Sequence, residues 1–320
     1  MPRLLIIKPS SLGDIVHGLQ FVASLQAQQP GWRVDWVARE IFAPLVQRAR
    51  GIDRVHVFAR RGGLRAFFQL LRQLRSTRYD AVFDLQGLFR SGLMTAAACA
   101  PRKVGRSDAR EGARLFYGET VPLPPGGARS HALEILLQFA PVLGAETELR
   151  GQVAFTSDHR ATFASLATLR QRPVLIFPES RRPEKNWPAF LELTTVWLAD
   201  PARPPVVWAG SEPVVADSGW PAERFVNLTG QTKLEELPEL LQRGRLVVGN
   251  DSGPLHLAAA LGVPVLALFG PTDPRQYGPY PPGTPGRAVL RAPGGDLTQL
   301  SVHAVSEALV DALAETGEDR

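Results

Sequence analysis

The chain has 320 residues, of which 44% are hydrophobic and 21% are charged, with a formal net charge of +5. This composition excludes a disordered or low-complexity chain and suffices for about two domains with their own cores. The single cysteine, Cys99, excludes a disulfide framework and a multi-cysteine metal site, and its apolar neighbours predict a buried side chain. The first residues form a strand-like run rather than a signal peptide, and no run of about 18 apolar residues occurs, so we expect a soluble cytoplasmic protein.

Strand-like runs alternate with helical periods along the whole chain. The first series predicts strands at 3–8, 33–38, 54–58, 79–84 and 102–105, and helices near 14–28, 40–49, 64–77, 88–99 and 131–143. The second predicts strands at 173–177, 205–209, 225–228, 245–249 and 264–269, and helices near 187–199, 233–243 and 253–261. This alternation is typical of parallel, doubly wound α/β sheets, in a first domain over 1–160 and a second over 172–300. A last helix, 302–315, has no strand after it, and we expect it to pack back on the first domain.

Arginines cluster in the first 150 residues, as in the stretch 60–78 and again in 102–114. Such clustering suits an anionic partner, although any single arginine can equally belong to a solvated helix face. No helix-turn-helix, zinc or RNA-binding signature accompanies the charge, so nucleic acid is not expected. An anionic lipid surface or an acidic sugar fits the pattern better.

The first strand leads into the stretch 7–17, which has one glycine and an acid, Asp14, where a dinucleotide-binding domain would have a glycine-rich loop. An acid in the first helical turn complements the helix dipole. The same environment favours the carboxylate form, which suits a general base facing a ligand. Position alone supports both interpretations of Asp14 equally.

The segment 247–274 predicts a strand, a Gly/Ser turn, a helix and a second strand. Ser252 or Gly253 can cap the helix, and Pro254 fits its first turn. Free backbone N–H groups and the positive end of the helix dipole form a seat for a phosphate or diphosphate, although an ordinary capped helix would have the same pattern. With His256 and Asp273 alongside, the segment predicts a nucleotide-sugar site.

Two further loops follow strands of the second domain. In the stretch 178–188, Lys185 precedes the next helix and could neutralise a diphosphate, and Arg181 and Arg182 could do the same or be solvated. Glu212 follows the strand 205–209 and could accept hydrogen bonds from a ribose diol, although an exposed loop acid is an equal alternative.

These motifs together resemble the ADP-heptose:lipopolysaccharide heptosyltransferases, glycosyltransferase family 9. The resemblance runs nearly the full length through KPSSLGDIVH, FDLQGLFRSGL, REGARLFYG, RSHALEILL, EKNWP, WAGSE, NDSGPLHLAAAL, FGPTDP and RAPGGDLTQL. It is strongest for the heptosyltransferase I group. It implies GT-B architecture, with two Rossmann-like domains facing a central cleft. It also implies inverting transfer of heptose from ADP-heptose to the Kdo of the lipopolysaccharide inner core.

The resemblance also implies roles for individual residues. Asp14 would be the general base, and the first domain would bind an anionic glycolipid such as Kdo-lipid A. Donor binding falls to Lys185, Glu212, Asp251, Ser252, Gly253, His256, Thr272 and Asp273. Acceptor binding falls to Arg60, Arg61, Arg110, Ser10, Ser11 and Gly13. At position 252 the family often has Thr, and Ser keeps the hydroxyl.

No cofactor is required by this interpretation. An Asp-x-Asp metal motif is missing from the expected loops, so we expect leaving-group stabilisation without a bound cation, while magnesium dependence stays open. The enzyme would work as a peripheral protein at the cytoplasmic face of the inner membrane. The alternatives are another GT-B transferase of surface polysaccharide assembly, such as a heptosyltransferase II, a GT-B-fold sugar-nucleotide epimerase, and a non-catalytic sugar-nucleotide binding protein.

Overall fold

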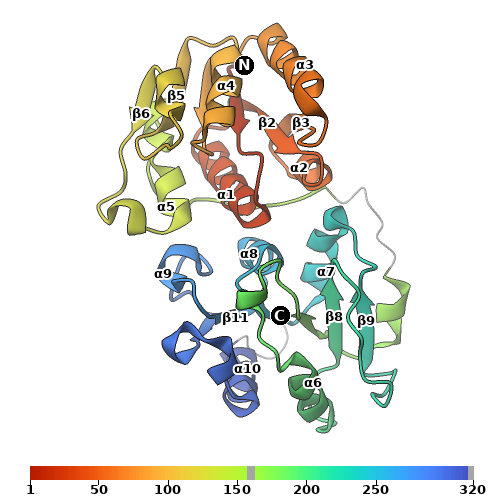
Figure 1. The fold of residues 1–320 in the computed structure, drawn as a ribbon. Helices are drawn as coiled ribbons and strands as arrows, with labels where there is room; N and C mark the ends of the chain where they lie inside the picture. Colours follow the sequence, from red (N-terminus) through yellow and green to blue (C-terminus); the bar gives the residue numbers. More distant parts are fainter. Residues whose placement is uncertain (157–162, 316–320) are drawn as a thin grey trace. The chain divides into compact units, whose positions relative to one another are not determined.

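The computed structural model describes residues 1–156 and 163–315 (Figure 1). The chain divides into two compact units, Met1–Thr156 and Ser157–Arg320, each of which has its own sheet. Within the described residues, no helix is long and apolar enough to cross a membrane.

The first unit contains a parallel six-stranded sheet in the order β3-β2-β1-β4-β5-β6. Its strands are β1 (Arg3–Ile7), β2 (Arg33–Arg39), β3 (Ile52–Phe58), β4 (Ala81–Asp84), β5 (Arg102–Arg106) and β6 (Glu119–Val121). Its helices are α1 (Leu12–Gln28), α2 (Ala43–Arg48), α3 (Gly63–Ser76), α4 (Phe89–Ala97) and α5 (Ala132–Leu137), with 3₁₀ turns η1 (Ala113–Phe116), η2 (Gly127–Arg129) and η3 (Ala140–Leu143). The central strand β1 is an apolar run from Leu4 to Ile7 that is fully buried, as a parallel strand covered on both faces requires.

The second unit has the same architecture, with the strand order β12-β11-β10-β7-β8-β9. Its strands are β7 (Val174–Phe177), β8 (Val206–Gly210), β9 (Phe225–Thr229), β10 (Leu246–Asn250), β11 (Val265–Phe269) and β12 (Arg287–Arg291). Its helices are α6 (Phe190–Leu198), α7 (Leu237–Arg243), α8 (Gly253–Ala260), α9 (Pro274–Tyr277) and α10 (Val302–Glu315). Shorter 3₁₀ turns are η4 (Ala164–Thr168), η5 (Pro183–Lys185), η6 (Leu234–Glu236), η7 (Pro293–Gly295) and η8 (Leu297–Gln299). The prediction of two doubly wound α/β sheets is confirmed.

The sequence pattern missed two strands, β6 and β12, which lie at the edges of the two sheets. Strand β6 has three residues, two of them exposed, and β12 begins and ends with an arginine. Edge strands are covered less than central strands, so they lack the continuous apolar run by which buried strands are recognised.

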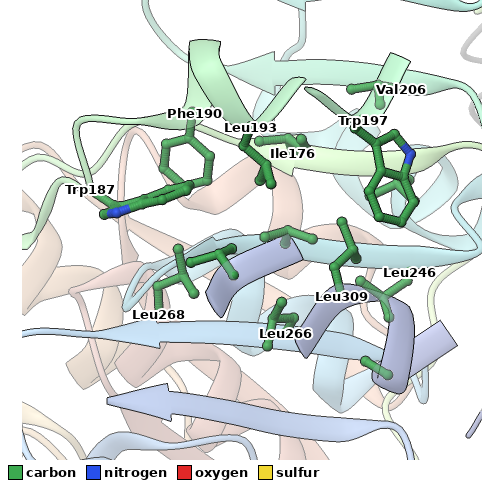
Figure 2. Close-up of a cluster of buried hydrophobic side chains, with 14 of the residues drawn as sticks. Ile176, Trp187, Phe190, Leu193, Trp197, Val206, Leu246, Leu266, Leu268 and Leu309 are labelled. Atoms are coloured by element: carbon green, nitrogen blue, oxygen red, sulfur yellow. The ribbon is translucent and has the colours of Figure 1, made fainter. Parts of the chain in front are cut away.

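Helix α10 packs in the core of the second unit, so the expectation that it returns to the first domain is wrong. Val305, Leu309 and Ala312 are buried and repeat at helical spacing, and they pack in a cluster that includes Leu246 of β10 and Leu266 of β11. Figure 2 shows Leu309 among these side chains. The apolar stripe of α10 therefore covers the sheet that the chain has just completed.

The expectation of a buried Cys99 is also wrong, because this side chain is exposed. Helix α4 ends at Ala97, with Ala98 as its extended C-cap. Residue 99 therefore leaves the helix instead of continuing its buried face, which the apolar composition of the segment does not reveal.

Candidate functional site

In the second unit, the turn between β10 and α8 forms the anticipated anion seat. Ser252 is the N-cap residue, Gly253 is the first residue of α8, and Pro254 lies in its first turn. The Ser252 hydroxyl makes no capping hydrogen bond, and within the described chain its buried Oγ has no partner. The first N–H groups of a helix have no partner within the helix, so hydroxyl, amides and dipole together suit a phosphate.

Directly before this turn, Asp251 is the centre of a buried polar cluster. One of its oxygens, Oδ2, lies 2.5 Å from Lys185 Nζ and accepts a 2.7 Å hydrogen bond from Thr272 Oγ1. The other, Oδ1, lies 3.2 Å from His256 Nε2. Burial alone would raise the pKa of Asp251, but His256, Lys185 and Thr272 outweigh it and hold that pKa well below its usual range. Four residues predicted to bind a donor are thus brought together around one ionised carboxylate.

The loop that carries Lys185 is held in place by the adjacent tryptophan and asparagine. The Trp187 N–H donates to Asn250 Oδ1 at 2.9 Å, and the buried Trp187 indole donates to the Leu300 carbonyl at 3.0 Å. Because Asn250 ends β10, this bond fixes the loop after β7 against the strand end that also carries Asp251. The Lys185 ammonium is therefore positioned by the backbone fold and not only by its ion pair.

The other predicted donor residues have separate roles in the structure. Asp273 caps α9 by accepting from the Arg275 N–H, and the Arg275 side chain lowers the pKa of Asp273 to about 2. Glu212 is exposed, and its N–H donates to Glu179 Oε2 at 3.3 Å. The sequence interpretation overlooked Glu179, although this acid also follows a strand end. Donor roles for Asp273 and Glu212 stay predictions.

In the first unit, Asp14 lies in the first turn of α1 and combines both properties anticipated for it. Its Oδ2 accepts from the Ser11 N–H at 2.9 Å and from the Ser11 hydroxyl at 2.8 Å, and its Oδ1 lies 3.0 Å from Lys8 Nζ. Burial would raise the pKa of Asp14, but the Lys8 ammonium and the Ser11 donors outweigh it and hold that pKa well below its usual range. Asp14 is therefore a helix cap and an ionised carboxylate at once.

Lys8 is a residue whose role the sequence did not reveal. It directly follows β1, its side chain is only 3% exposed, and its ammonium also donates to the Leu85 carbonyl at 3.2 Å. A buried lysine is rare unless it is paired. A lysine directly after a fully apolar strand and six residues before an acid is the signal that could have identified the pair.

A cavity of about 370 Å³ lies at the carboxyl ends of strands β1 to β5. Ligands bind at such strand ends in doubly wound sheets. The cavity is lined by Pro9, Ser10, Arg39, Phe58, Arg60, Gln86, Leu88, Phe89, Arg90, Ser91, Met94 and Glu111. Ser10 and Arg60, both predicted to bind the acceptor, belong to this lining. Arg61, Arg110, Ser11 and Gly13 do not.

Two polar groups in the cavity wall are left unsatisfied in the part of the chain that the structure describes. These are Arg39 Nε and Gln86 Oε1, both buried. Buried polar groups are almost always hydrogen-bonded, so an orphan donor and an orphan acceptor in one wall indicate a polar ligand. Three arginines, Arg39, Arg60 and Arg90, face one acid, Glu111, in the lining, which favours an acidic ligand. The sequence did not single out Arg39 or Gln86, although both stand at a strand end.

Over residues 1–156 and 163–315, no group of three or more His, Cys, Asp or Glu side chains is arranged to hold a metal ion. The carboxylates described above are instead paired with cations, hydroxyls and backbone amides.

The model of glycosyltransferase family 9 (heptosyltransferase) matches residues 67–285. A curated relative, lipopolysaccharide heptosyltransferase 1 of Escherichia coli O18:K1:H7, is 31% identical over 95% of this chain and 96% of its own length. The chain belongs to glycosyltransferase family 9. It is therefore a glycosyltransferase.

Other relatives agree with this assignment. The crystal structure of Escherichia coli heptosyltransferase WaaC with ADP is 29% identical, covers 97% of this chain and 99% of its own, and superposes with a TM-score of 0.78. Lipopolysaccharide heptosyltransferase 2 of Escherichia coli K12 is 28% identical over 85% of this chain and 84% of its own. The expected GT-B class is confirmed, and heptosyltransferase 1 matches over a larger share of the chain than heptosyltransferase 2.

Proposed function

We propose that this glycosyltransferase transfers heptose from ADP-heptose to the Kdo of a lipopolysaccharide inner-core acceptor, with inversion at the anomeric carbon. The single observation that supports it most is the similarity over nearly the whole chain to lipopolysaccharide heptosyltransferase 1. A heptosyltransferase structure that contains ADP supports the nucleotide. The anion seat and the arginine-lined cavity supply chemistry for an ADP-sugar and an acidic sugar.

The second unit binds the donor in this proposal. The diphosphate lies on the start of α8, where it accepts from the Ser252 hydroxyl and from the first free amides of the helix. Lys185, held by Asp251, adds a cation beside it. Fixed donors of this kind stabilise the negative charge that grows on the leaving diphosphate as the bond to the anomeric carbon breaks.

Asp14 serves as the general base. It accepts the proton of the acceptor hydroxyl while that oxygen forms its bond to the anomeric carbon and ADP leaves with the former bonding pair. The depressed pKa keeps the carboxylate ionised at neutral pH, which makes Asp14 always ready but only weakly basic. Lys8 and Ser11 hold the carboxylate in place and thereby orient it.

The first unit binds the acceptor, and the cavity at its strand ends takes the acidic sugar. The carboxylate of Kdo matches the guanidinium groups of Arg39, Arg60 and Arg90, since arginine pairs with carboxylates through two parallel hydrogen bonds. Because such an acceptor is attached to a lipid, we place the enzyme at the cytoplasmic face of the inner membrane as a peripheral protein.

The test is to incubate the protein with ADP-heptose, with and without Kdo-lipid A, and to follow ADP release and the donor's identity. A transferase releases ADP in proportion to the acceptor added. A sugar-nucleotide epimerase would convert the donor without any acceptor, and that result would overturn the proposal. Offering an acceptor that already carries one heptose separates a heptosyltransferase I from a heptosyltransferase II.

A further inference from the structure

Helix α3 of the first unit exposes two large apolar side chains. Leu64 is 76% exposed and Phe68 is 59% exposed, although the helix buries other apolar residues. Figure 1 shows α3 on the outside of the first unit. Residues four apart lie on one side of a helix, so Leu64 and Phe68 form one projecting stripe. Large apolar groups that project together cost free energy in water, so the stripe calls for an occupant.

The same stripe continues into arginines. Arg72 and Arg75 follow Phe68 at spacings of four and three residues, and both are exposed, as is Arg65 beside Leu64. From residue 59 to 78 the chain contains six arginines and no acid. In the described chain no ion pair joins Arg65, Arg72 or Arg75 to a carboxylate. The exposed face of α3 is therefore apolar at its start and strongly basic along its length.

The opposite face of α3 anchors the helix to the unit. Leu70 and Leu74 are fully buried, and Phe67 and Leu71 pack against the same core cluster, which includes Phe58 of β3 and Met94 of α4. The buried and exposed apolar residues thus lie on different sides of one helix. Because the fold already satisfies the buried side, the projecting pair is not needed for the core.

We propose that α3 is the element that docks this enzyme on an anionic lipid bilayer, with Leu64 and Phe68 inserted among the lipids and the arginines on the headgroups. Basic helices with a large apolar residue on the exposed face lie in the plane of the bilayer interface. Charge complementarity favours a lipid surface over a second copy of the chain, since two copies of this acid-free segment would repel each other. The proposal rests on the proposed function for its biological sense.

The position of α3 relative to the cavity fits this docking. Arg60, which lines the cavity, precedes Gly63, the first residue of α3, by three positions. A bilayer in contact with Leu64 therefore lies within a few residues of the cavity that we assign to the acceptor sugar. An acceptor whose lipid chains stay in the membrane needs its sugar bound close to that surface.

The experiment is flotation of the full chain with vesicles, without donor or acceptor. One set of vesicles contains phosphatidylglycerol and phosphatidylethanolamine, and the other contains phosphatidylcholine alone. The test variants are Leu64→Gln/Phe68→Gln and Arg72→Gln/Arg75→Gln. Their controls are Val215→Gln, an apolar residue 87% exposed in the second unit, and Arg129→Gln/Arg150→Gln, which removes two exposed cations elsewhere in the first unit.

The wild type and both controls should bind the anionic vesicles and not the phosphatidylcholine vesicles. Removal of Arg72 and Arg75 should weaken binding by about 30-fold, and added salt should weaken wild-type binding. In a Cys99→Ser background, a polarity-sensitive dye on Phe68→Cys should shift to shorter wavelength only with anionic vesicles. Binding that the α3 variants leave unchanged, or a change in oligomeric state in their place, would overturn the proposal.

The outcome is separable from that of the proposed function. The α3 variants should keep wild-type affinity for ADP and wild-type transfer to a water-soluble Kdo acceptor, so a general loss of folding would be recognised at once. If the protein binds vesicles through α3 but transfers no heptose, the docking surface stands and the proposed function fails. If it transfers heptose to soluble acceptors but ignores vesicles, the reverse holds.

Discussion

Replacing Lys185 with Met removes the ammonium beside the anion seat and keeps most of the length of the side chain. In the wild type this ammonium lies 2.5 Å from Asp251 Oδ2, and the Lys185 side chain is only 14% exposed. A charged hydrogen bond is worth about 1.5–3 kcal/mol, so loss of the contact to the diphosphate should raise the Kd for ADP by about 10- to 150-fold.

The same substitution should also lower the free energy of unfolding. Breaking a buried ion pair costs about 3–5 kcal/mol when the remaining charge has no other partner. Asp251 keeps Thr272 and His256, so we expect the smaller loss of about 1–3 kcal/mol that accompanies one missing hydrogen bond. Urea denaturation measures this loss, and the protein should stay folded at room temperature.

Calorimetric titration with ADP is the decisive assay. The matched control is Arg182→Gln in the same loop, which removes an exposed cation already paired with Glu184 and should leave ADP affinity within about twofold. If Lys185→Met binds ADP as tightly as the wild type while Arg182→Gln loses affinity, the assignment of the diphosphate contact to Lys185 is refuted.

The pH dependence of the unfolding free energy gives an independent check. Because the pKa of Asp251 is depressed in the folded state, its contribution to stability is present above the unfolded value near pH 4 and disappears as the pH falls below it. Loss of Lys185 raises that folded pKa and so reduces the contribution. The stability difference between wild type and Lys185→Met should therefore be largest above about pH 4 and shrink in acid.

Three further substitutions test other parts of the account. Asp14→Asn keeps an acceptor for the helix cap but removes the base, so kcat should fall about 10²–10⁴-fold with ADP affinity retained; near-normal turnover would leave Asp14 as a cap only. Arg60→Gln/Arg61→Gln should raise the KM for the acceptor in steady-state assays and leave ADP binding alone, and the opposite pattern would contradict the division of labour. Tyr117→Phe removes the hydroxyl that donates to the fully buried Asp84 at 2.7 Å and should cost about 1–3 kcal/mol in urea denaturation, and unchanged stability would show that this bond is dispensable.

The sequence predicted the layered α/β architecture because the central strands are fully apolar and alternate with helical periods. It failed where that signal is weak, at the short edge strand β6 and the arginine-flanked β12. It also failed for α10, because an apolar helical stripe shows that a helix packs but not on which sheet it packs. Cys99 was misplaced for a similar reason, since composition does not reveal where a helix ends.

Parts of the candidate site could be predicted because each follows a strand end within a recognisable local pattern. The pairing of Lys185 with Asp251 joins residues 66 positions apart, and no spacing rule indicates such a contact. The cavity of the first unit depends even more on the fold, because five separate strand ends contribute to it. Arg39 and Gln86 stand out only when their buried polar atoms are seen without partners in that wall, within the described residues.

The central claim is that this chain adds heptose to the Kdo of a lipid-linked acceptor, and the mass of the acceptor tests it most directly. Kdo-lipid A incubated with the wild-type protein and ADP-heptose should gain the mass of one heptose, and Asp14→Asn should give far less product under the same conditions. An acceptor whose mass stays unchanged, with a protein that demonstrably binds ADP and Kdo-lipid A, would contradict the account.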